Sequence, residues 1–280
     1  MRIVTRAEEM QWVCRELRVS GAVLGLVPTM GALHEGHLSL VRRARGECSV
    51  VAASIFVNPL QFGPNEDFAE YPRTFPEDCA ALEREGVGVV FAPDAAEMYP
   101  PGAVTTVTVA EVGDRLDGAS RPGHFSGVAT VVAKLLHIVG PARAYFGQKD
   151  AAQLAVLRRM VRDLNFDVKL VGCAIVRDAD GLALSSRNRY LSENERGHAL
   201  ALRRSLLTME KMIAEGERDS EALMQAGRRV LDAEAGIRVD YLAVVDADTL
   251  MPVQTAAAGT LVAVAAWIGG TRLIDNFLAR

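Results

Sequence analysis

The sequence predicts an α/β protein, in which a Rossmann-like, doubly wound parallel sheet is followed by a smaller α+β domain. In the first part of the chain, short apolar runs alternate with helical patterns, as expected of parallel strands covered by helices on both faces. The run from Ser49 to Val57 is nearly continuous and is the clearest of these strands. After about residue 190 the pattern changes to amphipathic helices followed by strands. We therefore expect residues 1–176 to form the first domain and residues 177–280 the second.

The composition is that of an ordinary globular protein. The chain has 280 residues, of which 50% are hydrophobic and 24% charged, enough for one or two domains with a substantial core. A formal net charge of −4 argues against nucleic acid as the main partner. No run is apolar enough for a membrane span, and the N-terminus lacks a signal peptide's apolar segment. The four cysteines form no C-x-x-C pair, so we expect free buried thiols, no metal site and a cytoplasmic protein.

Elements of the first domain follow from hydrophobic periodicity and turn residues. Thr5 with Glu8 predicts a capping box for the first helix, whose Trp12 and Leu17 are expected to face the sheet. The polar segment from Gly63 to Phe75 is expected to be a flap over the site. Helices are expected over residues 5–19, 38–45, 76–85, 126–139 and from 151 onward, and strands over 22–28, 49–57, 87–92, 104–109, 142–146 and 167–176.

Elements of the second domain are predicted in the same way. Ser192 with Glu195 fits a capping box, which marks the start of a long amphipathic helix. Helices are expected over residues 193–215 and 220–235, and strands over 239–245, 261–267 and 272–276.

The stretch from Pro28 to His37 links the first predicted strand to the helix that follows. Its glycines break the local pattern, and His34 and His37 are three residues apart, so they share one face of a first helical turn. The unpaired N–H groups of such a turn bind anions. Two imidazoles beside them indicate a phosphate-rich ligand. An ordinary strand–turn–helix unit with a structural histidine is the alternative.

Polar side chains also follow other predicted strands. Asn58 and Gln61 lie after the strand that ends at Val57, where ligands of open α/β sheets bind, although Asn58-Pro59 also fits a simple turn. Lys149 stands at a helix start, which disfavours a cation unless an anion balances it, although a surface lysine remains the alternative. The loop from Ser185 to Asn188 is dense in hydrogen-bond donors and suits phosphates, or is a generic polar loop.

These strings together resemble a known enzyme family. H-x-G-H after a strand resembles the signature of the nucleotidylyltransferase superfamily, and residues 28–37 closely resemble the pantoate–β-alanine ligases, or pantothenate synthetases. The likeness covers nearly the whole chain and includes residues 54–63, 71–74, 121–125, 146–150, 185–191 and 271–276, with Gln153. Two departures are Leu184, where the family often has Met, and Ala152, where it usually has the first of two glutamines.

The resemblance implies a two-step reaction in which pantoate attacks ATP to give pantoyl-adenylate and pyrophosphate. β-Alanine then displaces AMP to give pantothenate, a precursor of coenzyme A. His37, His34 and Lys149 would be catalytic, and Gln61 and Gln153 would bind pantoate and β-alanine. The ATP site would comprise Met30, Gly31, Ala32, Leu33, His34, Glu35, Gly36, His37, Gly147, Gln148, Lys149, Asp150, Val176, Leu184, Ser185, Ser186 and Arg187.

The resemblance also implies partners and motion. Magnesium would enter on the phosphates of ATP, with no dedicated protein site; Asp78 is a candidate ligand or an ordinary helix-start carboxylate. A homodimer is expected, and the second domain is expected to close over the first as a lid. The alternative function is another H-x-G-H nucleotidylyltransferase-type enzyme, which would release a nucleotidylated product instead of AMP. A non-catalytic nucleotide-binding protein on the same scaffold is the other alternative.

Overall fold

The computed structural model describes residues 1–64 and 66–280. These residues divide into two compact units. Unit 1 comprises residues Met1–Gly147 and Val156–Ala174, and unit 2 comprises Gln148–Ala155 and Ile175–Arg280. The boundary expected after residue 176 is next to Ile175, where the chain enters unit 2 for the second time; the division of function between two domains stays a prediction.

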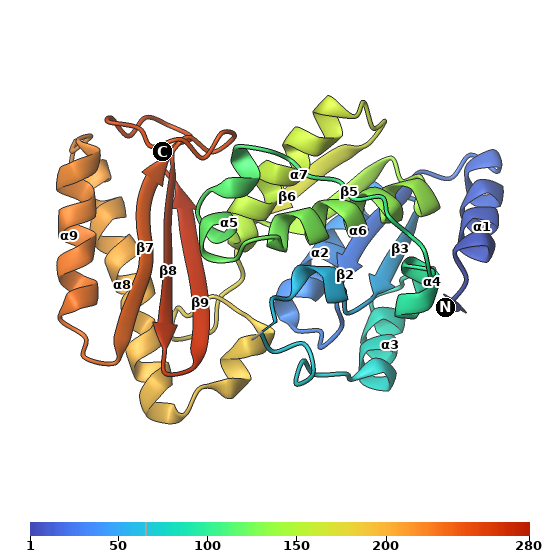
Figure 1. The fold of residues 1–280 in the computed structure, drawn as a ribbon, viewed down its shortest axis with the longest axis horizontal. Coiled ribbons are helices and arrows are strands. Elements are labelled where there is room, and N and C mark those ends of the chain that lie inside the picture. Colours follow the sequence, from blue (N-terminus) through green and yellow to red (C-terminus); the bar gives the residue numbers. More distant parts are fainter. Residues whose placement is uncertain (65) are drawn as a thin grey trace. The chain divides into compact units, whose positions relative to one another are not determined.

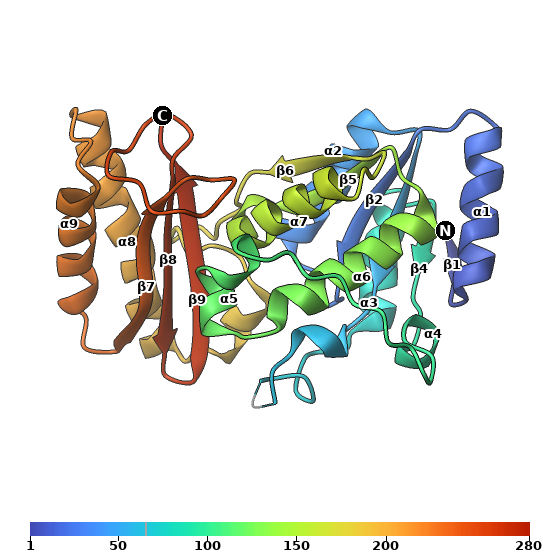
Figure 2. The same cartoon turned by 45° about the horizontal axis from the view of Figure 1, so that its top comes forward.

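Unit 1 is built on a parallel sheet (Figures 1 and 2). Its strands in the described residues follow the order β1-β4-β3-β2-β5-β6, and every neighbouring pair is parallel. They span Arg2–Val4 (β1), Leu24–Thr29 (β2), Val50–Ile55 (β3), Val89–Phe91 (β4), Arg143–Gly147 (β5) and Lys169–Cys173 (β6). The chain runs outward from β2 to β3 and β4, then crosses back to β5 and β6. The strand order therefore reverses between β2 and β5, and ligands bind beyond the carboxyl ends of strands at such a point.

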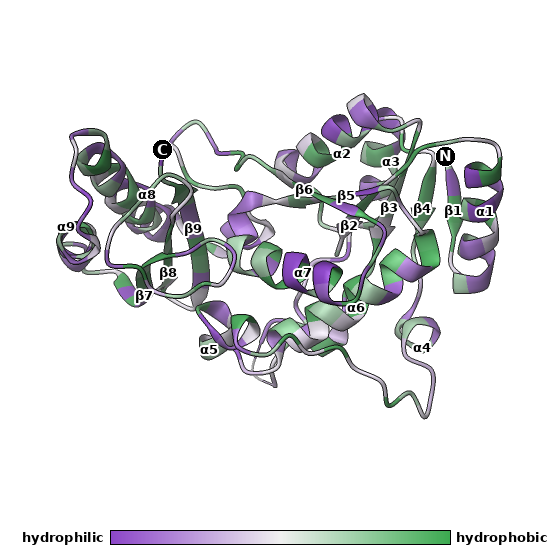
Figure 3. Cartoon of the chain, turned by 90° about the horizontal axis from the view of Figure 1, so that it is seen from above, coloured by the Kyte–Doolittle hydropathy of each residue, from purple (hydrophilic) through white to green (hydrophobic). Residues whose placement is uncertain are grey.

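Helices cover both faces of this sheet (Figure 3). α2 packs on β2, β3 and β5, and α6 approaches β2 and α1. The core is formed by apolar strand residues such as Val27, Val51 and Val90, none of which is exposed. The helices are α1 (Ala7–Val19), α2 (Glu35–Glu47), α3 (Phe75–Arg84), α4 (Ala95–Met98), α5 (Asp117–Ser120) and α6 (His124–Val139), with α7 (Ala151–Asp163) shared between the units and short 3-10 turns η1 (Pro59–Gln61), η2 (Val112–Asp114) and η3 (Gln148–Asp150).

Unit 2 contains an antiparallel sheet of order β7-β8-β9, packed against two helices. Leu206 and Met209 of one helix pack with Val262 and Val264 of the central strand in one apolar core. Ser192 begins that helix with the predicted capping box, in which it exchanges hydrogen bonds with Glu195. The elements are η4 (Ser186–Tyr190), α8 (Glu193–Ala214), α9 (Ser220–Asp232), β7 (Ile237–Val245), β8 (Leu261–Ile268) and β9 (Thr271–Leu278).

Two expectations for α1 are wrong. Thr5 and Glu8 form no capping box: the N-cap is Arg6, whose side chain makes no capping bond, and the amide of Ala7 instead donates to the Glu97 carboxylate at 2.8 Å. A tertiary contact thus satisfies the first turn of the helix. Trp12 does not face the sheet either, since 53% of it is exposed. The buried stripe of α1 runs through other residues, namely Met10, Val13 and Cys14.

The strand expected over residues 104–109 is also wrong. Its alternating Val and Thr residues have high β-propensity, but propensity yields a strand only where a neighbour offers a ladder. Here the backbone bonds to the side chains of α6 instead: Val107 donates to Thr130 Oγ1 at 2.9 Å and accepts from Ser126 Oγ at 3.4 Å. No local pattern indicated the edge strand β1 or the short helices α4 and α5. Part of the expected flap, residue 65, lies outside the described residues.

Candidate active site

The loop after β2 adopts a backbone conformation that a buried carboxylate stabilises. Gly31 and Ala32 have φ values of 83° and 50°, and the second is uncommon for a residue with a side chain. Asp78, only 3% exposed, accepts the N–H of Ala32 at 2.9 Å and of Leu33 at 2.8 Å. Thr74 Oγ1 adds a third bond at 3.1 Å. Asp78 therefore braces the loop, which favours a structural role for it over that of a magnesium ligand.

The two histidines form the start of α2. His34 is the N-cap, and its Nδ1 accepts the N–H of Gly36 at 3.1 Å. His37 Nδ1 accepts the N–H of His34 at 3.3 Å, and the two ring centroids are 4.1 Å apart. Since each Nδ1 is an acceptor, each neutral ring carries its proton on Nε2. The capping box thus makes both rings hydrogen-bond donors at Nε2.

A network of amides positions Gln61 at the carboxyl end of β3. Asn58 is 1% exposed, and its Nδ2 donates to Gln61 Oε1 at 3.1 Å and to the Gly127 carbonyl at 3.1 Å. Its Oδ1 accepts from Tyr99 Oη at 2.8 Å. Both polar atoms of the Asn58 side chain thus make hydrogen bonds within the protein. The Gln61 amide nitrogen points toward the loop after β2, where Nε2 donates to Met30 Sδ at 2.8 Å. The close approach of α6 needs Gly127, because a Cβ there would lie 2.2 Å from the Leu60 carbonyl oxygen.

The loop from Arg121 to Phe125 contacts the backbone of Gln61. His124 Nδ1 donates to the Gln61 carbonyl at 2.8 Å, and its Nε2 lies 3.0 Å from Arg121 Nη1. Burial and the neighbouring guanidinium of Arg121 lower the pKa of His124 to about 4, so the ring is neutral at physiological pH. Arg121 also holds Glu66 of the expected flap with two bonds of 2.7 and 2.6 Å. This loop therefore links the flap segment to Gln61.

Lys149 lies on η3, directly after β5. Its ammonium group has no hydrogen-bond or ion-pair partner among the described residues, although the adjoining start of α7 disfavours a cation. That position is consistent with an anionic ligand. Gln153, one turn further along, is partly buried near the start of α7.

A hairpin in unit 2 brings two candidate residues together. The N–H of Leu184 donates to the Val176 carbonyl at 3.0 Å, and Arg177 and Ala183 form a bridge between them. The Ser-Ser-Arg sequence follows at once, where Ser185 Oγ caps η4 by accepting from the N–H of Arg187 at 3.3 Å. A polar turn thus presents these backbone and side-chain groups together.

The sequence-predicted residues divide between the two units. Unit 1 contains the loop from Met30 to His37, together with Gln61 and Gly147. Unit 2 contains Gln148, Lys149, Asp150, Gln153, Val176, Leu184, Ser185, Ser186 and Arg187. The bracing roles of Asp78 and Tyr99 were not predicted, because a buried hydrogen bond between distant segments leaves no local pattern.

Comparison with known proteins assigns the family. The family model described as pantoate-beta-alanine ligase matches residues 2–278. The chain belongs to the pantoate-beta-alanine ligase family.

Individual relatives agree with the family match. A pantothenate synthetase of Acidobacterium capsulatum is 66% identical over 91% of this chain and 85% of its own length. That of Koribacter versatilis is 57% identical over 99% of this chain and 96% of its own length. The crystal structure of pantothenate synthetase from Thermus thermophilus has a TM-score of 0.93 at 48% identity and covers 99% of both chains.

Membership establishes the reaction class. The chain is a ligase that uses ATP to join pantoate to β-alanine, as the pantoate-beta-alanine ligase family does. A related structure from Francisella tularensis, 34% identical with a TM-score of 0.79 over 99% of this chain and 97% of its own, is described as complexed with beta-gamma ATP and beta-alanine. No helix among residues 1–64 and 66–280 has the length and apolar character needed to cross a bilayer.

Proposed function

We propose that this ligase forms pantothenate through a pantoyl-adenylate, with His34 and His37 stabilising charge on the phosphates of ATP. The observation that carries the proposal is the reciprocal capping of the two rings, which makes each a donor at Nε2. Donors that are oriented before the reaction stabilise a developing charge without reorganising during it. The nucleophile is the carboxylate of pantoate, so the mechanism asks no protein side chain to attack.

We assign the remaining ATP contacts to both units. In unit 1 the loop Met30, Gly31, Ala32, Leu33, His34, Glu35, Gly36 and His37 takes part, with Gly147. In unit 2, Lys149 supplies a cation for the phosphates, and backbone and side-chain groups come from Gln148, Asp150, Val176, Leu184, Ser185, Ser186 and Arg187. The ammonium of Lys149, unpaired within the described part of the chain, and the donors of the polar turn support this assignment.

Gln61 and Gln153 are proposed to bind the acid substrates. Gln61 Oε1 is held by Asn58, which leaves its Nε2 as the donor group beside Met30. An amide N–H of this kind suits a hydroxyl or carboxylate oxygen of pantoate. Because both polar atoms of the Asn58 side chain make hydrogen bonds within the protein, Gln61 is oriented before substrate arrives, and that lowers the entropic cost of binding.

Magnesium is proposed to enter with ATP, on its phosphate oxygens, as is usual for this ion. The donors offered by the candidate residues are mainly N–H groups and cations, which suit phosphate oxygens. Bound there, the ion would neutralise phosphate charge. We also propose a cytoplasmic homodimer, as the family resemblance implies. Light scattering coupled to gel filtration tests the dimer.

Pantoate-dependent exchange of pyrophosphate into ATP tests the adenylate. With ATP, magnesium and pantoate but no β-alanine, we expect labelled pyrophosphate to enter ATP. Addition of β-alanine should then yield equal amounts of AMP and pantothenate. If exchange required β-alanine, or if a nucleotidylated product accumulated instead of AMP, the proposed order of steps would be wrong.

A further inference from the structure

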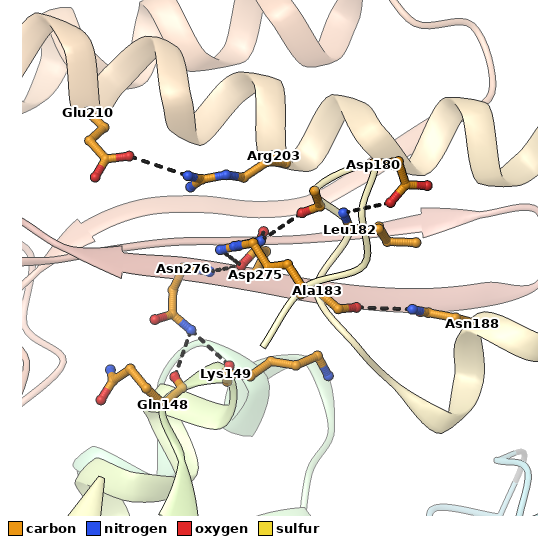
Figure 4. A network of polar contacts seen from close by, with 12 residues as sticks. Gln148, Lys149, Asp180, Leu182, Ala183, Asn188, Arg203, Glu210, Asp275 and Asn276 are labelled. Carbon is orange, nitrogen blue, oxygen red and sulfur yellow. Dashed lines mark hydrogen bonds and ion pairs between the residues drawn. The ribbon is translucent and has the colours of Figure 1, made fainter. Parts of the chain in front are cut away.

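Strand β9 carries a buried amide that contacts the segment bearing Lys149. Asn276 is 2% exposed, and its Nδ2 donates to the carbonyl of Gln148 at 3.0 Å and to that of Lys149 at 2.8 Å. Figure 4 shows the Asn276 amide directed at this backbone, while the side chain of Lys149 extends away from it. All three residues belong to unit 2. Asn276 therefore contacts the backbone of Lys149 and leaves its ammonium group available.

The chemistry of the contact sets the orientation of the amide. Both partners are carbonyl oxygens, which only accept, so the nitrogen of Asn276 must face them. Its Oδ1 is buried and has no hydrogen-bond partner among the described residues. An unpaired buried oxygen opposes folding and offsets part of what the two bonds contribute. Stability alone therefore does not explain an amide at this position. What its two hydrogen bonds provide is a fixed conformation of the backbone at Lys149.

The neighbouring residue on β9 holds a second candidate segment. Asp275 is 4% exposed and forms a bidentate ion pair with Arg177. Arg177 Nη1 donates to Oδ2 at 2.7 Å and Nη2 donates to Oδ1 at 2.9 Å. Arg177 also donates to the Gly181 carbonyl at 3.1 Å, within the hairpin that joins Val176 to Leu184. Successive side chains of a strand point to opposite faces. One strand thus supports the Lys149 segment from one face and the hairpin from the other.

We propose that Asn276 is a positioning residue for the ligase reaction, which acts by fixing the backbone from which Lys149 reaches the phosphates of ATP. The inference rests on the proposed role of Lys149. A cation that must meet a developing charge loses effect when its backbone is free to shift, since misplacement by about 1 Å can cost on the order of a hundredfold in rate. Asn276 itself does not touch the substrate.

Asn276→Leu and Asn276→Ala test this role. Both remove the two N–H donors without adding a charge, and Leu also keeps approximately the volume of the side chain. We expect pantoate-dependent ATP–pyrophosphate exchange to fall about tenfold or more, with the KM for β-alanine unchanged. The melting temperature should also fall by a few degrees, because the carbonyls of Gln148 and Lys149 lose a donor. A variant that kept full exchange would overturn the proposal.

Ser205→Ala is the matched control. Ser205 lies on α8, is fully buried in the same unit and donates to the Gly227 carbonyl of α9 at 2.9 Å, so its bond involves neither Lys149 nor the hairpin. It also loses a buried side-chain-to-carbonyl bond, so its melting temperature should fall similarly or more, while exchange stays at the wild-type rate. If exchange fell equally in the control, loss of stability would explain the effect and the proposal would fail.

A double-mutant cycle separates this inference from the role of Lys149. In a Lys149→Ala background, Asn276→Leu should lower exchange no further, because the residue acts through that lysine. Additive losses would overturn the positioning role. If Lys149→Ala alone left exchange unchanged, the proposed role of Lys149 would be wrong and this inference would fall with it. If Lys149→Ala lowered exchange but Asn276→Leu and Asn276→Ala did not, only the present inference would fail.

Discussion

The Nδ1 atom of His37 accepts the backbone N–H of His34 at 3.3 Å, and this bond determines which ring nitrogen carries the proton. The same side chain therefore has two functions, a helix cap through Nδ1 and a proposed phosphate contact through Nε2. Substitutions can separate the two.

His37→Asn should retain the cap and lose the phosphate contact. The Asn oxygen can accept the N–H of His34, so we expect near wild-type stability but adenylate formation reduced roughly a hundredfold. His37→Ala should lose both functions, with a further loss of about 1 kcal/mol in stability. Exchange kinetics and chemical denaturation measure the two effects. Turnover near the wild-type rate in either variant would refute the proposed phosphate contact.

Lys149→Ala should weaken the first half-reaction by about a hundredfold, as loss of one charge-stabilising group commonly does. The measurement is pantoate-dependent exchange at saturating ATP. Lys211→Ala is the control, since the side chain of this lysine of the same unit is 76% exposed and, among the residues described, pairs only with Glu215, the C-cap of α8, at 3.6 Å. Equal rates in the wild type and the Lys149 variant would make Lys149 a surface residue without a catalytic role.

Asp78→Ala should lower both the stability of the protein and its activity, because Asp78 holds the loop after β2. The N–H groups of Ala32 and Leu33 would remain buried without an acceptor, so we expect a loss of about 2–4 kcal/mol in the free energy of unfolding. The adjacent Glu77→Ala, at an exposed position of α3, should change it by less than about 0.5 kcal/mol. Urea denaturation compares them. If Asp78→Ala were as stable as the control, the bracing role would be incorrect.

His124 should make stability depend on pH between about 4 and 6.5. Burial and Arg121 lower the native pKa of His124 to about 4 from the ordinary 6.5, against the weaker opposing effects of the hydrogen bond to the Gln61 carbonyl and of Asp117 and Glu66. As the pH falls through this window, the unfolded chain takes up a proton that the native ring does not, so stability is lost on acidification. The full loss is about 3 kcal/mol at pH 4 relative to pH 7.

The variant His124→Asn isolates this contribution. Its amide can still donate to the Gln61 carbonyl, but it does not titrate. Between pH 7 and pH 4 the wild type should therefore lose about 3 kcal/mol more in its free energy of unfolding than the variant does. Parallel stability curves over this range would show that His124 is not held neutral in the native state.

Local sequence patterns were sufficient for most of the fold. The apolar runs identified β2 to β6 in outline, and the capping box at Ser192 placed the start of α8 within one residue. The string from Pro28 to His37 also identified the family, which the comparisons confirm. Such features depend on neighbouring residues, so they can be recognised in one dimension. Residue roles within the site stay predictions.

Only the tertiary structure decided how the central loop is held. Asp78 reaches back 46 and 45 residues to the amides of Ala32 and Leu33, and Asn276 reaches 127 residues to Lys149. Likewise, the pattern over residues 104–109 predicted a strand, but this segment pairs with no neighbouring strand. The hydrogen-bond partners of its backbone lie on a distant segment, α6. The sequence alone determined most of the strands and helices and the reactive groups. The backbone geometry around Ala32, Leu33 and Lys149 came from long-range hydrogen bonds, which no local pattern encodes.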